Sequence, residues 1–359
     1  MIPRIVHVAS GREWRGGQRQ VWLLARALGR MGVEQVVVTG RGTELARRVR
    51  AGGVRVHPTS WRMGLDPRVL WPILRELRRS PAILHAHDAH SLTLGGLATQ
   101  LTGTPLVVTR RVDFPLRRRG YWGRAQRVIA ISNAVAGVLQ RDGIPRDRIT
   151  VVHSGISLES IAAVTRLGIR GQLGLSPHAL VAANVAALVP HKDQATLIAA
   201  AARLKQSFPD LHWVVAGEGE LRPVLERLVD QAGLRGRVHL VGHIEDPVRL
   251  IADADLFVMS SREEGLGTSV LDAMALGIPV ASTGAGGLPE MLRNGAGLLV
   301  PPGNPEALAN AVVRILGDGD LRAQLAERAR AEVLRFTDSR MAEELGSVYR
   351  SCVHSLGGS

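Results

Sequence analysis

The sequence has little of several residue types, and each shortage excludes a class of protein. Only one cysteine, Cys352, occurs in 359 residues, so no disulfide can form within the chain and a reducing compartment is indicated. A lone thiol of this kind is expected to have no catalytic role. Aromatic residues make up 3% of the chain and no recognition motif for nucleic acid occurs, so a nucleic-acid partner is not expected.

Long uninterrupted apolar runs are also scarce. The stretch Ala179–Pro190 contains Asn184 and falls well short of the ~20 residues that a membrane-spanning helix needs. The first eight residues, Met1 to Val8, are too short and too interrupted for a signal peptide and predict a buried strand. We therefore expect a cytoplasmic protein, either free or peripheral at the inner face of the membrane.

Lysine is missing from the first half of the chain, and charge is unevenly distributed. Residues 1–165 contain 26 arginines and ten acidic residues, a formal net charge of +16, whereas the remainder contains 19 basic and 22 acidic residues, a net charge of −3. A basic half attracts anions, such as an anionic membrane surface or a phosphorylated substrate. The alternative is an arginine-rich solvated surface from a biased genome, although bias alone would not leave the second half acidic.

Short β-branched runs alternate with amphipathic stretches, a pattern typical of a parallel sheet with helices on both faces. A loop with glycines at both ends, residues 11–17, follows the first run and leads into side chains at helical spacing. The strands predicted in the first half are Ile5–Ala9, Gln35–Thr39, Val54–His57, Ile83–His87, Leu106–Thr109, Val128–Ser132 and Thr150–His153.

The pattern restarts in the second half, which predicts two doubly wound α/β domains with a cleft between them. We expect domains at residues 1–165 and 166–337, a linker near Ser157–Gly171, and a last helix within residues 338–359 that packs back on the first domain. The second domain is predicted to contain strands Leu180–Ala187, His212–Ala216, Val238–Val241, Leu256–Met259 and Pro279–Ala281, with helices Asp193–Phe208, Glu220–Ala232 and Thr268–Leu276.

The strongest local signal is a glycine-containing turn in residues 260–274, after the strand Leu256–Met259 and at the start of a helix. Glycines there let backbone amides approach an anion, and the positive end of the helix dipole favours a phosphate. Glu264 precedes the turn and Asp272 follows two helical turns later, so one carboxylate can meet a sugar and the other a ribose. The alternative is a structural glycine turn with a capping carboxylate.

Further segments, in the same order and spacing, make the chain resemble the retaining nucleotide-sugar glycosyltransferases of family 4. That family has the GT-B fold, two Rossmann-like domains facing across a cleft, with the acceptor on the first and the donor on the second. The resemblance runs nearly end to end and is carried by Gly16-Gly17, Ala130–Asn133, Val151–Ile156, Leu188–Lys192, Gly217–Gly219, Glu264–Asp272 and Gly286–Glu290.

The resemblance implies roles for the matching residues. Lys192 would pair with the donor diphosphate and Glu264 would bind the donor sugar, so these two are the predicted catalytic residues. Asp272 would face the ribose and His243 the base. Neither a metal nor a cofactor is expected, since the nucleotide-sugar is a co-substrate. The implied donor-binding residues are Gly16, Gly17, Lys192, His243, Glu264, Gly265, Leu266, Gly267, Thr268, Ser269 and Asp272.

Three departures from the family pattern leave the donor and the rate open. Asp272 stands where the family has glutamate, Ala187 where an arginine is usual, and Arg111 where many members have a histidine. Arg110 or Arg111 is then expected to supply positive charge. The acceptor contacts that we expect are His87, Asp88, Arg111 and Asp113, with His90 as a further candidate.

Three other motifs have simpler interpretations. Asp253-Ala254-Asp255 imitates a metal-binding Asp-x-Asp but is expected to be structural. His85 and His87 share one face of a strand, yet a metal site also needs ligands from elsewhere. Arg117–Arg119, next to Tyr121 and Trp122, predicts either a solvated loop or contact with a membrane surface or an anionic acceptor.

The sequence thus predicts retaining transfer from a nucleotide-sugar, with UDP as the favoured nucleotide, to a lipid-linked or phosphorylated glycan in cell-envelope synthesis, such as a lipopolysaccharide or glycolipid. One alternative is a non-catalytic sugar- or nucleotide-binding homologue, because of Ala187 and Asp272. Another is a nicotinamide oxidoreductase, although a clear G-x-G-x-x-G after the first strand is lacking.

Overall fold

Two parallel sheets organise the residues that the computed structural model describes, which are 2–61, 66–116 and 120–354. The first unit combines residues 1–157 with residues 336–359, and the second spans residues 158–335. The division falls earlier than the predicted boundary at 165 because helix α6 (Leu158–Ala162) already contacts helix α11 of the second unit.

The first unit is built on seven parallel strands in the order β3-β2-β1-β4-β5-β6-β7. The order reverses direction between β1 and β4, and ligands of doubly wound sheets bind beyond the carboxyl ends of the strands at such a point. Strand β4 ends at Ala86, so His87 lies in the loop that leads away from the switch point. The strands are β1 Arg4–Ala9, β2 Gln35–Gly40, β3 Arg55–Thr59, β4 Ala82–Ala86, β5 Leu106–Arg110, β6 Arg127–Ala130 and β7 Ile149–Val151.

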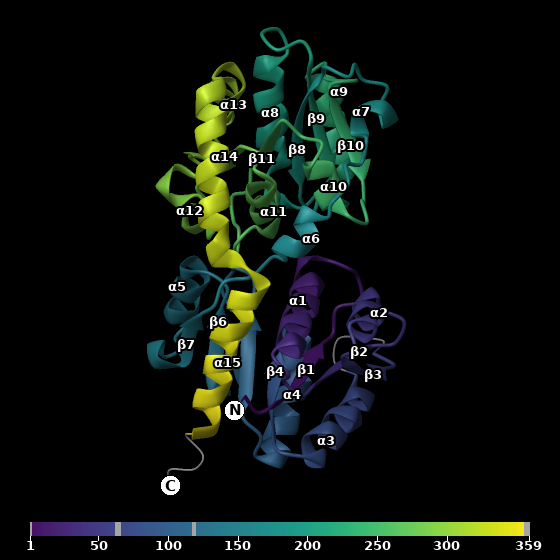
Figure 1. Ribbon diagram of the computed structural model, residues 1–359, viewed down its shortest axis with the longest axis vertical. Helices are drawn as coiled ribbons and strands as arrows, with labels where there is room; N and C mark the ends of the chain where they lie inside the picture. Colours follow the sequence, from purple (N-terminus) through teal and green to yellow (C-terminus); the bar gives the residue numbers. More distant parts are fainter. Residues whose placement is uncertain (1, 62–65, 117–119, 355–359) are drawn as a thin grey trace. The chain divides into compact units, whose positions relative to one another are not determined.

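The C-terminal helix α15 (Asp338–His354) packs against α1 within this first unit (Figure 1, yellow among purple and blue). Its apolar residues, among them Leu345 and Tyr349, share one buried cluster with Leu24 and Leu28 of α1. The remaining helices are α1 Gly16–Arg30, α2 Glu44–Ala51, α3 Leu70–Arg79, α4 Ala89–Thr102 and α5 Asn133–Arg141, with 3-10 turns Pro67–Val69, Gly120–Arg124 and Arg146–Arg148.

The second unit contains six parallel strands in the order β10-β9-β8-β11-β12-β13, and its switch point lies between β8 and β11. The edge strand β13 was not predicted, because three residues give too short a pattern to recognise. The strands are β8 Leu180–Val185, β9 Leu211–Ala216, β10 Val238–Gly242, β11 Leu256–Met259, β12 Val280–Thr283 and β13 Leu298–Val300.

Helices cover the second sheet, and α11 has the same bounds as the sequence predicts. Helices α8 and α13 pack together over the cluster that contains Trp213. The helices are α6 Leu158–Ala162, α7 Ile169–Gln172, α8 Gln194–Leu204, α9 Arg222–Gln231, α10 Pro247–Ile251, α11 Thr268–Leu276, α12 Leu288–Met291, α13 Pro305–Gly317 and α14 Gly319–Val333, with 3-10 turns Pro190–Lys192, Arg293–Gly295 and Leu334–Phe336.

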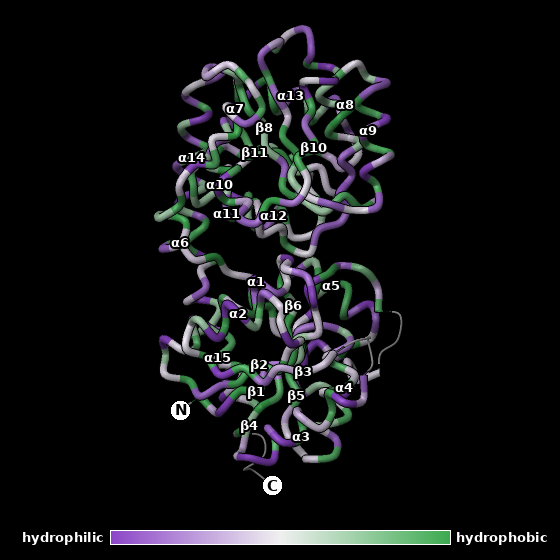
Figure 2. Tube along the Cα trace, turned by 90° about the vertical axis from the view of Figure 1, so that its right-hand side faces the viewer, coloured by the Kyte–Doolittle hydropathy of each residue, from purple (hydrophilic) through white to green (hydrophobic). Residues whose placement is uncertain are grey.

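The central strands of each unit are almost entirely buried, as expected for parallel strands covered on both faces. Hydrophobic residues follow these strands in Figure 2, whereas many outer turns are hydrophilic. Within the described residues, no helix is long and apolar enough to cross a membrane.

Candidate functional site

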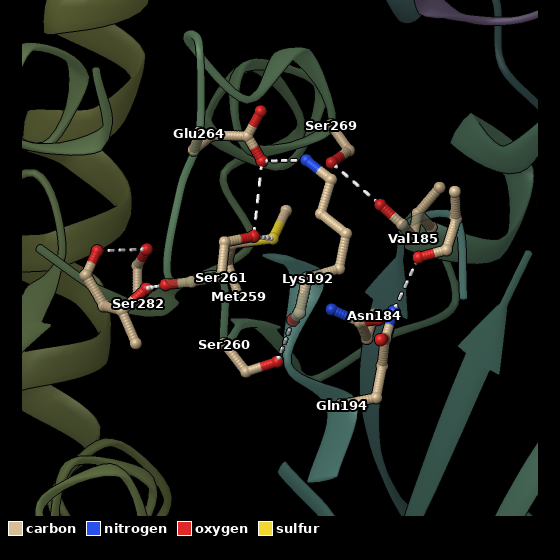
Figure 3. A network of polar contacts seen from close by, with 12 residues as sticks. Asn184, Val185, Lys192, Gln194, Met259, Ser260, Ser261, Glu264, Ser269 and Ser282 are labelled. Atoms are coloured by element: carbon tan, nitrogen blue, oxygen red, sulfur yellow. Dashed lines mark hydrogen bonds and ion pairs between the residues drawn. The ribbon is translucent and has the colours of Figure 1, made fainter. Parts of the chain in front are cut away.

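An ion pair joins two loops at the carboxyl ends of β8 and β11 in the second unit. The Lys192 ammonium, in the 3-10 turn after β8, contacts the Glu264 carboxylate, in the loop after β11 (Figure 3). The Ser261 hydroxyl also donates to Glu264 over 3.3 Å. Both charged side chains are largely buried, at 16% and 10% exposure. The structure therefore brings the two predicted catalytic residues together.

Hydrogen bonds hold the two loops against each other beneath this pair. The Ser260 hydroxyl donates to the Lys192 carbonyl over 3.0 Å, and the Arg262 amide donates to the His191 carbonyl over 2.8 Å. Arg262 also donates through Nε to the Asp193 carboxylate, which caps helix α8. These contacts consequently fix the positions of the loops that carry Lys192 and Glu264.

Gly267 gives the β11–α11 loop its shape and opens helix α11. Its φ of 92° lies in the left-handed region, and a Cβ atom there would stand 2.9 Å from Leu288 and 3.3 Å from Glu264. Any other residue would be strained and crowded, which explains glycine at this position. Helix α11 has no side-chain cap at Gly267 and no acidic residue in its first turn, as far as the described chain shows. Glu264 lies close to this start of α11. The first backbone amides there have no partner within the helix, and the helix dipole has its positive end there.

The other predicted donor-binding residues of this unit surround the same turn. Leu266 is buried, whereas the Ser269 hydroxyl donates to the Val185 carbonyl over 3.1 Å and ties α11 to β8. Asp272 is 1% exposed in the second turn of α11. His243 is exposed after β10. Gly265 and Thr268 complete the turn around Gly267.

Gly217 and Gly219 allow a close approach between the loops after β9 and β8. A Cβ atom at Gly217 would stand 2.0 Å from the Ala186 carbonyl oxygen, and one at Gly219 would stand 2.2 Å from that of Leu188. The Leu188 amide donates to the Glu218 carbonyl over 3.0 Å. These two glycines shape the backbone that leads to Lys192.

In the first unit, the predicted acceptor residues lie around the carboxyl ends of β1, β4 and β5. Asp88 caps helix α4 through the Ser91 amide and also accepts hydrogen bonds from the amide and hydroxyl of Ser10. Arg111 follows β5 and donates to Nδ1 of His87 over 3.2 Å. A Cβ atom at Gly17, in the first turn of α1, would lie 3.7 Å from Cδ of Arg111. Gly16 begins the same helix.

Sequence reasoning singled out His85 and His87 but missed His7, which completes a cluster of three buried histidines next to Arg111. His7 on β1 is the register partner of His85 on β4, and His87 follows one residue after that strand. Their ring nitrogens lie within 4.8 Å of one another, so the cluster has the geometry to bind a metal ion. Each of the six ring nitrogens already has a polar partner, among them Tyr349 and Thr109 for His85.

Burial lowers the pKa of His7 to about 4 and the pKa values of His85 and His87 well below the ordinary value. The three imidazoles are therefore neutral near pH 7. The signal that predicts this cluster is the parallel pairing of β1 with β4, which places equivalent residues of two histidine-containing strands side by side.

The remaining residues singled out near the acceptor region lie as follows. His90 is exposed on α4, and Asp113 lies near Arg110, whose pKa it raises against the lowering effect of burial. Trp122 does not face solvent, as contact with a membrane surface requires: it is 6% exposed and stacks with Arg110, whose guanidinium carbon is 5.4 Å from the ring centroid. Arg117–Arg119 lie outside the described residues.

The Asp253-x-Asp255 pair is structural, as predicted. One Asp253 carboxylate oxygen accepts from the Ile169 amide over 2.9 Å. The Asp255 carboxylate accepts from Arg170 over 2.6 Å and from the Val181 amide over 2.8 Å. The carboxylates of Asp253 and Asp255 thus fix α7 and β8 to the start of β11.

The second unit combines a cation, a carboxylate and the start of a helix around one turn. Lys192 and the first amides of α11 favour a diphosphate, whereas Glu264 accepts hydrogen bonds from hydroxyl groups. The first unit offers the cation Arg111 near the start of another helix. This chemistry suits a phosphorylated, polyhydroxylated ligand.

Comparison with known proteins agrees with this chemistry. Residues 14–160 match the family described as "Glycosyltransferase Family 4" and residues 167–332 the family described as "Glycosyl transferases group 1". The chain is 31% identical, over 90% of its length and 92% of the other's, to the "Lipopolysaccharide core biosynthesis glycosyltransferase LpsE" of Rhizobium meliloti (strain 1021). It is 27% identical to the "Alpha-D-kanosaminyltransferase" of Streptomyces kanamyceticus, covering 79% of this chain and 81% of that one.

A solved structure shares the fold over almost the whole chain. Anabaena Alr3699/HepE, in a crystal structure described as a complex with UDP-glucose, superposes with a TM-score of 0.84 at 21% identity. The match covers 97% of this chain and 100% of that one. The two doubly wound units are therefore those of the GT-B fold, as predicted.

Proposed function

The chain belongs to glycosyltransferase family 4, and we propose that it moves a sugar from a UDP-sugar to a lipid-linked or phosphorylated glycan acceptor, with retention of the anomeric configuration and without a metal ion. The observation that carries this proposal is the Lys192–Glu264 pair beside the start of α11. A lipopolysaccharide-core glycosyltransferase among the relatives supports a glycan acceptor in the cell envelope.

Each residue of the donor turn has a distinct task in this proposal. Lys192 and the α11 amides balance the negative charge that grows on the departing diphosphate, which is the charge a catalyst gains most by stabilising. Glu264 accepts hydrogen bonds from donor sugar hydroxyls and so fixes the ring. Because the two side chains pair with each other in this structure, the donor inserts by replacing their contact.

The proposed chemistry exchanges one bond at the anomeric carbon for another on the same face of the sugar. The bond from the anomeric carbon to the diphosphate oxygen breaks, and a bond to the acceptor oxygen forms. The proton of the acceptor hydroxyl passes to the departing phosphate oxygen. Lys192 therefore acts on the leaving group.

A panel of nucleotide-sugars in a thermal-unfolding assay tests donor binding, because a ligand that binds only the native state raises its stability. A donor at a hundred times its dissociation constant adds about 2.7 kcal/mol. We expect UDP-sugars to stabilise the full chain and Lys192→Ala to lose most of that effect. The matched control is Arg235→Ala, an exposed cation paired with Asp230 away from the turn. No stabilisation by any nucleotide or nucleotide-sugar would contradict the proposal.

The second candidate is a non-catalytic binding protein, favoured by Ala187, which replaces the family's usual arginine, and by the shorter carboxylate of Asp272. Incubation of the stabilising donor with the protein separates the two. Transfer to an added acceptor, or slow hydrolysis of the donor, supports the enzyme. Binding without any turnover supports the second candidate.

A further inference from the structure

The Arg111 guanidinium in the first unit has no direct ion-pair partner among the described residues. Its Nη2 atom donates to His87, while its buried Nε atom has no hydrogen-bond partner among the residues that the structure describes. No carboxylate of the described chain lies within the 4.0 Å of an ion pair with it. Asp88 opposes the lowering effect of burial on the pKa of Arg111 from beyond ion-pair distance, while its oxygens accept hydrogen bonds from Ser10 and Ser91. Burial lowers the pKa of Arg111 to about 10, so it remains charged at neutral pH.

A chain of hydrogen bonds behind Arg111 has only one possible direction. A guanidinium can only donate, so Nδ1 of His87 accepts and the proton of this neutral ring lies on Nε2. Nε2 of His87 then donates to Nδ1 of His7 over 3.0 Å. Nε2 of His7 in turn donates to Oε1 of Gln35 over 3.2 Å.

The far end of the chain requires the same direction independently. The Ala25 carbonyl can only accept, so Nε2 of Gln35, 2.7 Å away, must donate to it. That orientation of the amide turns Oε1 toward His7. An additional proton on either histidine would place a donor against a donor, and burial opposes it as well. These hydrogen bonds therefore leave a lone pair on Nδ1 of His87, which orients Arg111 without neutralising its charge.

A metal ion in the histidine cluster is the competing interpretation. It would need one nitrogen from each ring and would therefore displace one partner of each, including either Tyr349 or Thr109 at His85, which both lie 2.7 Å away. It would also lie beside the Arg111 cation, which contacts His87 directly. Both the occupied nitrogens and the neighbouring positive charge oppose a cation at this position.

A half-buried guanidinium that has no direct ion-pair partner and has an Nε donor without a hydrogen bond can bind an anion through its remaining donors. The side chain of Arg111 passes the first turn of α1 at Gly17, where the helix amides and dipole also favour an anion. We propose that Arg111 binds a phosphoryl group of a substrate, and that Gln35, His7 and His87 are positioning residues that hold its guanidinium toward that group. Identifying the anion as part of a substrate rests on the proposed function, whereas the binding itself does not.

Binding of inorganic phosphate to the full chain, measured by calorimetry, tests the site without turnover. We expect Arg111→Gln to weaken phosphate binding at least about tenfold, since a charge-assisted hydrogen bond is lost. Arg235→Gln removes an equal charge from an exposed position in the second unit and is expected to bind phosphate like the wild type. Equal phosphate affinity in Arg111→Gln and the wild type would overturn the proposal.

A second measurement addresses the positioning chain. Two-bond ¹H–¹⁵N correlation spectra report the tautomer of each histidine, and we expect neutral rings with the proton on Nε2 for both His7 and His87. Phosphate is expected to shift the Nδ1 resonance of His87 and to leave the His212–His239 pair, which is a similar contact in the second unit, unchanged. A proton on Nδ1 of His87, or stoichiometric Zn²⁺ binding that His87→Gln removes, would contradict the proposed positioning role of these residues.

The same variants distinguish the two sources of the phosphoryl group. If Arg111→Gln weakens both phosphate and UDP binding, the group is the donor diphosphate. If it weakens phosphate alone, the group belongs to a phosphorylated acceptor. Lys192→Ala tests the proposed donor turn separately, because its effect on UDP does not depend on the phosphate result.

Discussion

The Tyr349 hydroxyl lies 2.7 Å from Nδ1 of His85, although the two residues are 264 positions apart in the chain. This contact links helix α15 to the centre of the first sheet. His85 in turn contacts the Thr109 hydroxyl through Nε2, so both of its ring nitrogens have partners in a fully buried position. Burial raises the pKa of the Tyr349 hydroxyl, which therefore stays protonated at neutral pH.

Tyr349→Phe is expected to destabilise the protein by about 1–3 kcal/mol, because it leaves a buried ring nitrogen of His85 without a partner. Urea unfolding measures the loss. Tyr121→Phe is the matched control, since it removes the other tyrosine hydroxyl, whose bond to Gln100 is exposed and 3.5 Å long. Equal stability of both variants would contradict a structural role for the Tyr349–His85 contact.

Stability is expected to fall as the pH is lowered from neutrality toward about 4. The pKa of His7 is about 4 in the folded state and near 6.5 in the unfolded state. Between these two pH values the unfolded protein binds a proton at His7 and the folded protein does not. The shifted pKa of His7 alone therefore lowers the free energy of unfolding by about 3 kcal/mol as the pH falls from about 6.5 to about 4. Above about pH 6.5 it has no such effect. The rings of His85 and His87 change stability in the same direction.

Urea unfolding at several pH values and constant ionic strength checks this dependence. The groups around His7 are Gln35, His85, His87 and, through His87, Arg111, and none of them supplies a negative charge that would hold an added proton. His7→Gln is expected to flatten the dependence. A slope that is unchanged in His7→Gln would show that other groups cause it.

Lys192→Ala and Glu264→Gln are each expected to reduce the transfer rate about a hundredfold, which corresponds to ~3 kcal/mol of lost transition-state stabilisation. Each variant also leaves its former partner without its ion pair, so unfolding must be measured in parallel to show that the fold persists. Arg235→Ala serves as the control with an exposed ion pair. Near-normal rates in both variants would remove these residues from the donor site.

Transfer is expected to continue in excess EDTA. Lys192 and the start of α11 already supply positive charge to a diphosphate, and the carboxylates of Asp253 and Asp255 are engaged by backbone and arginine donors. The rate with EDTA is compared with the rate after adding Mg²⁺ or Mn²⁺. Abolition by EDTA with rescue by either ion would establish a metal requirement.

The basic half of the chain is expected to bind anionic vesicles more strongly than neutral ones. At about 1 kcal/mol per basic residue, changing Arg117, Arg118 and Arg119 to serine weakens this binding by up to ~3 kcal/mol. High salt reduces the effect, because exposed charges are screened over about 10 Å at about 0.1 M. Co-sedimentation at two salt levels measures it.

The control for vesicle binding changes three exposed arginines of the second unit, Arg203, Arg227 and Arg235, to serine. It removes the same charge from the part of the chain with a negative net charge. Equal binding to neutral and anionic lipids, or equal losses in both triple variants, would leave the basic half without a membrane role. A soluble acceptor would then be favoured.

Most strands and the donor turn were predictable from local patterns. Leu256–Met259 and Thr268–Leu276 have the predicted bounds, since a buried strand, a glycine turn and an apolar helix follow one another without ambiguity. The pairing of Lys192 with Glu264 agrees with motif positions, although neither periodicity nor spacing shows that their side chains meet. Asp253 and Asp255 were interpreted correctly because they directly precede a buried strand.

Features that depend on register or on distant segments were not predictable. The His7–His87 contact requires knowing that β1 and β4 are neighbours, and Tyr349 reaches His85 only because α15 returns to the first unit. The basic surroundings of Trp122 predict contact with a membrane surface as one alternative, but Trp122 is buried and contacts Arg110. In each case a partner from another element of the fold decides the environment.

The return of helix α15 to the first unit sets an order for folding on the ribosome. Residues 158–335 emerge as a continuous segment and can complete the second unit while α15 is still being synthesised. The first unit, although its strands are made earlier, lacks the buried side chains of Leu345 and Tyr349 until translation reaches them. We therefore expect the half of the protein that is synthesised first to finish folding last, with the apolar face of α1 uncovered in the interval.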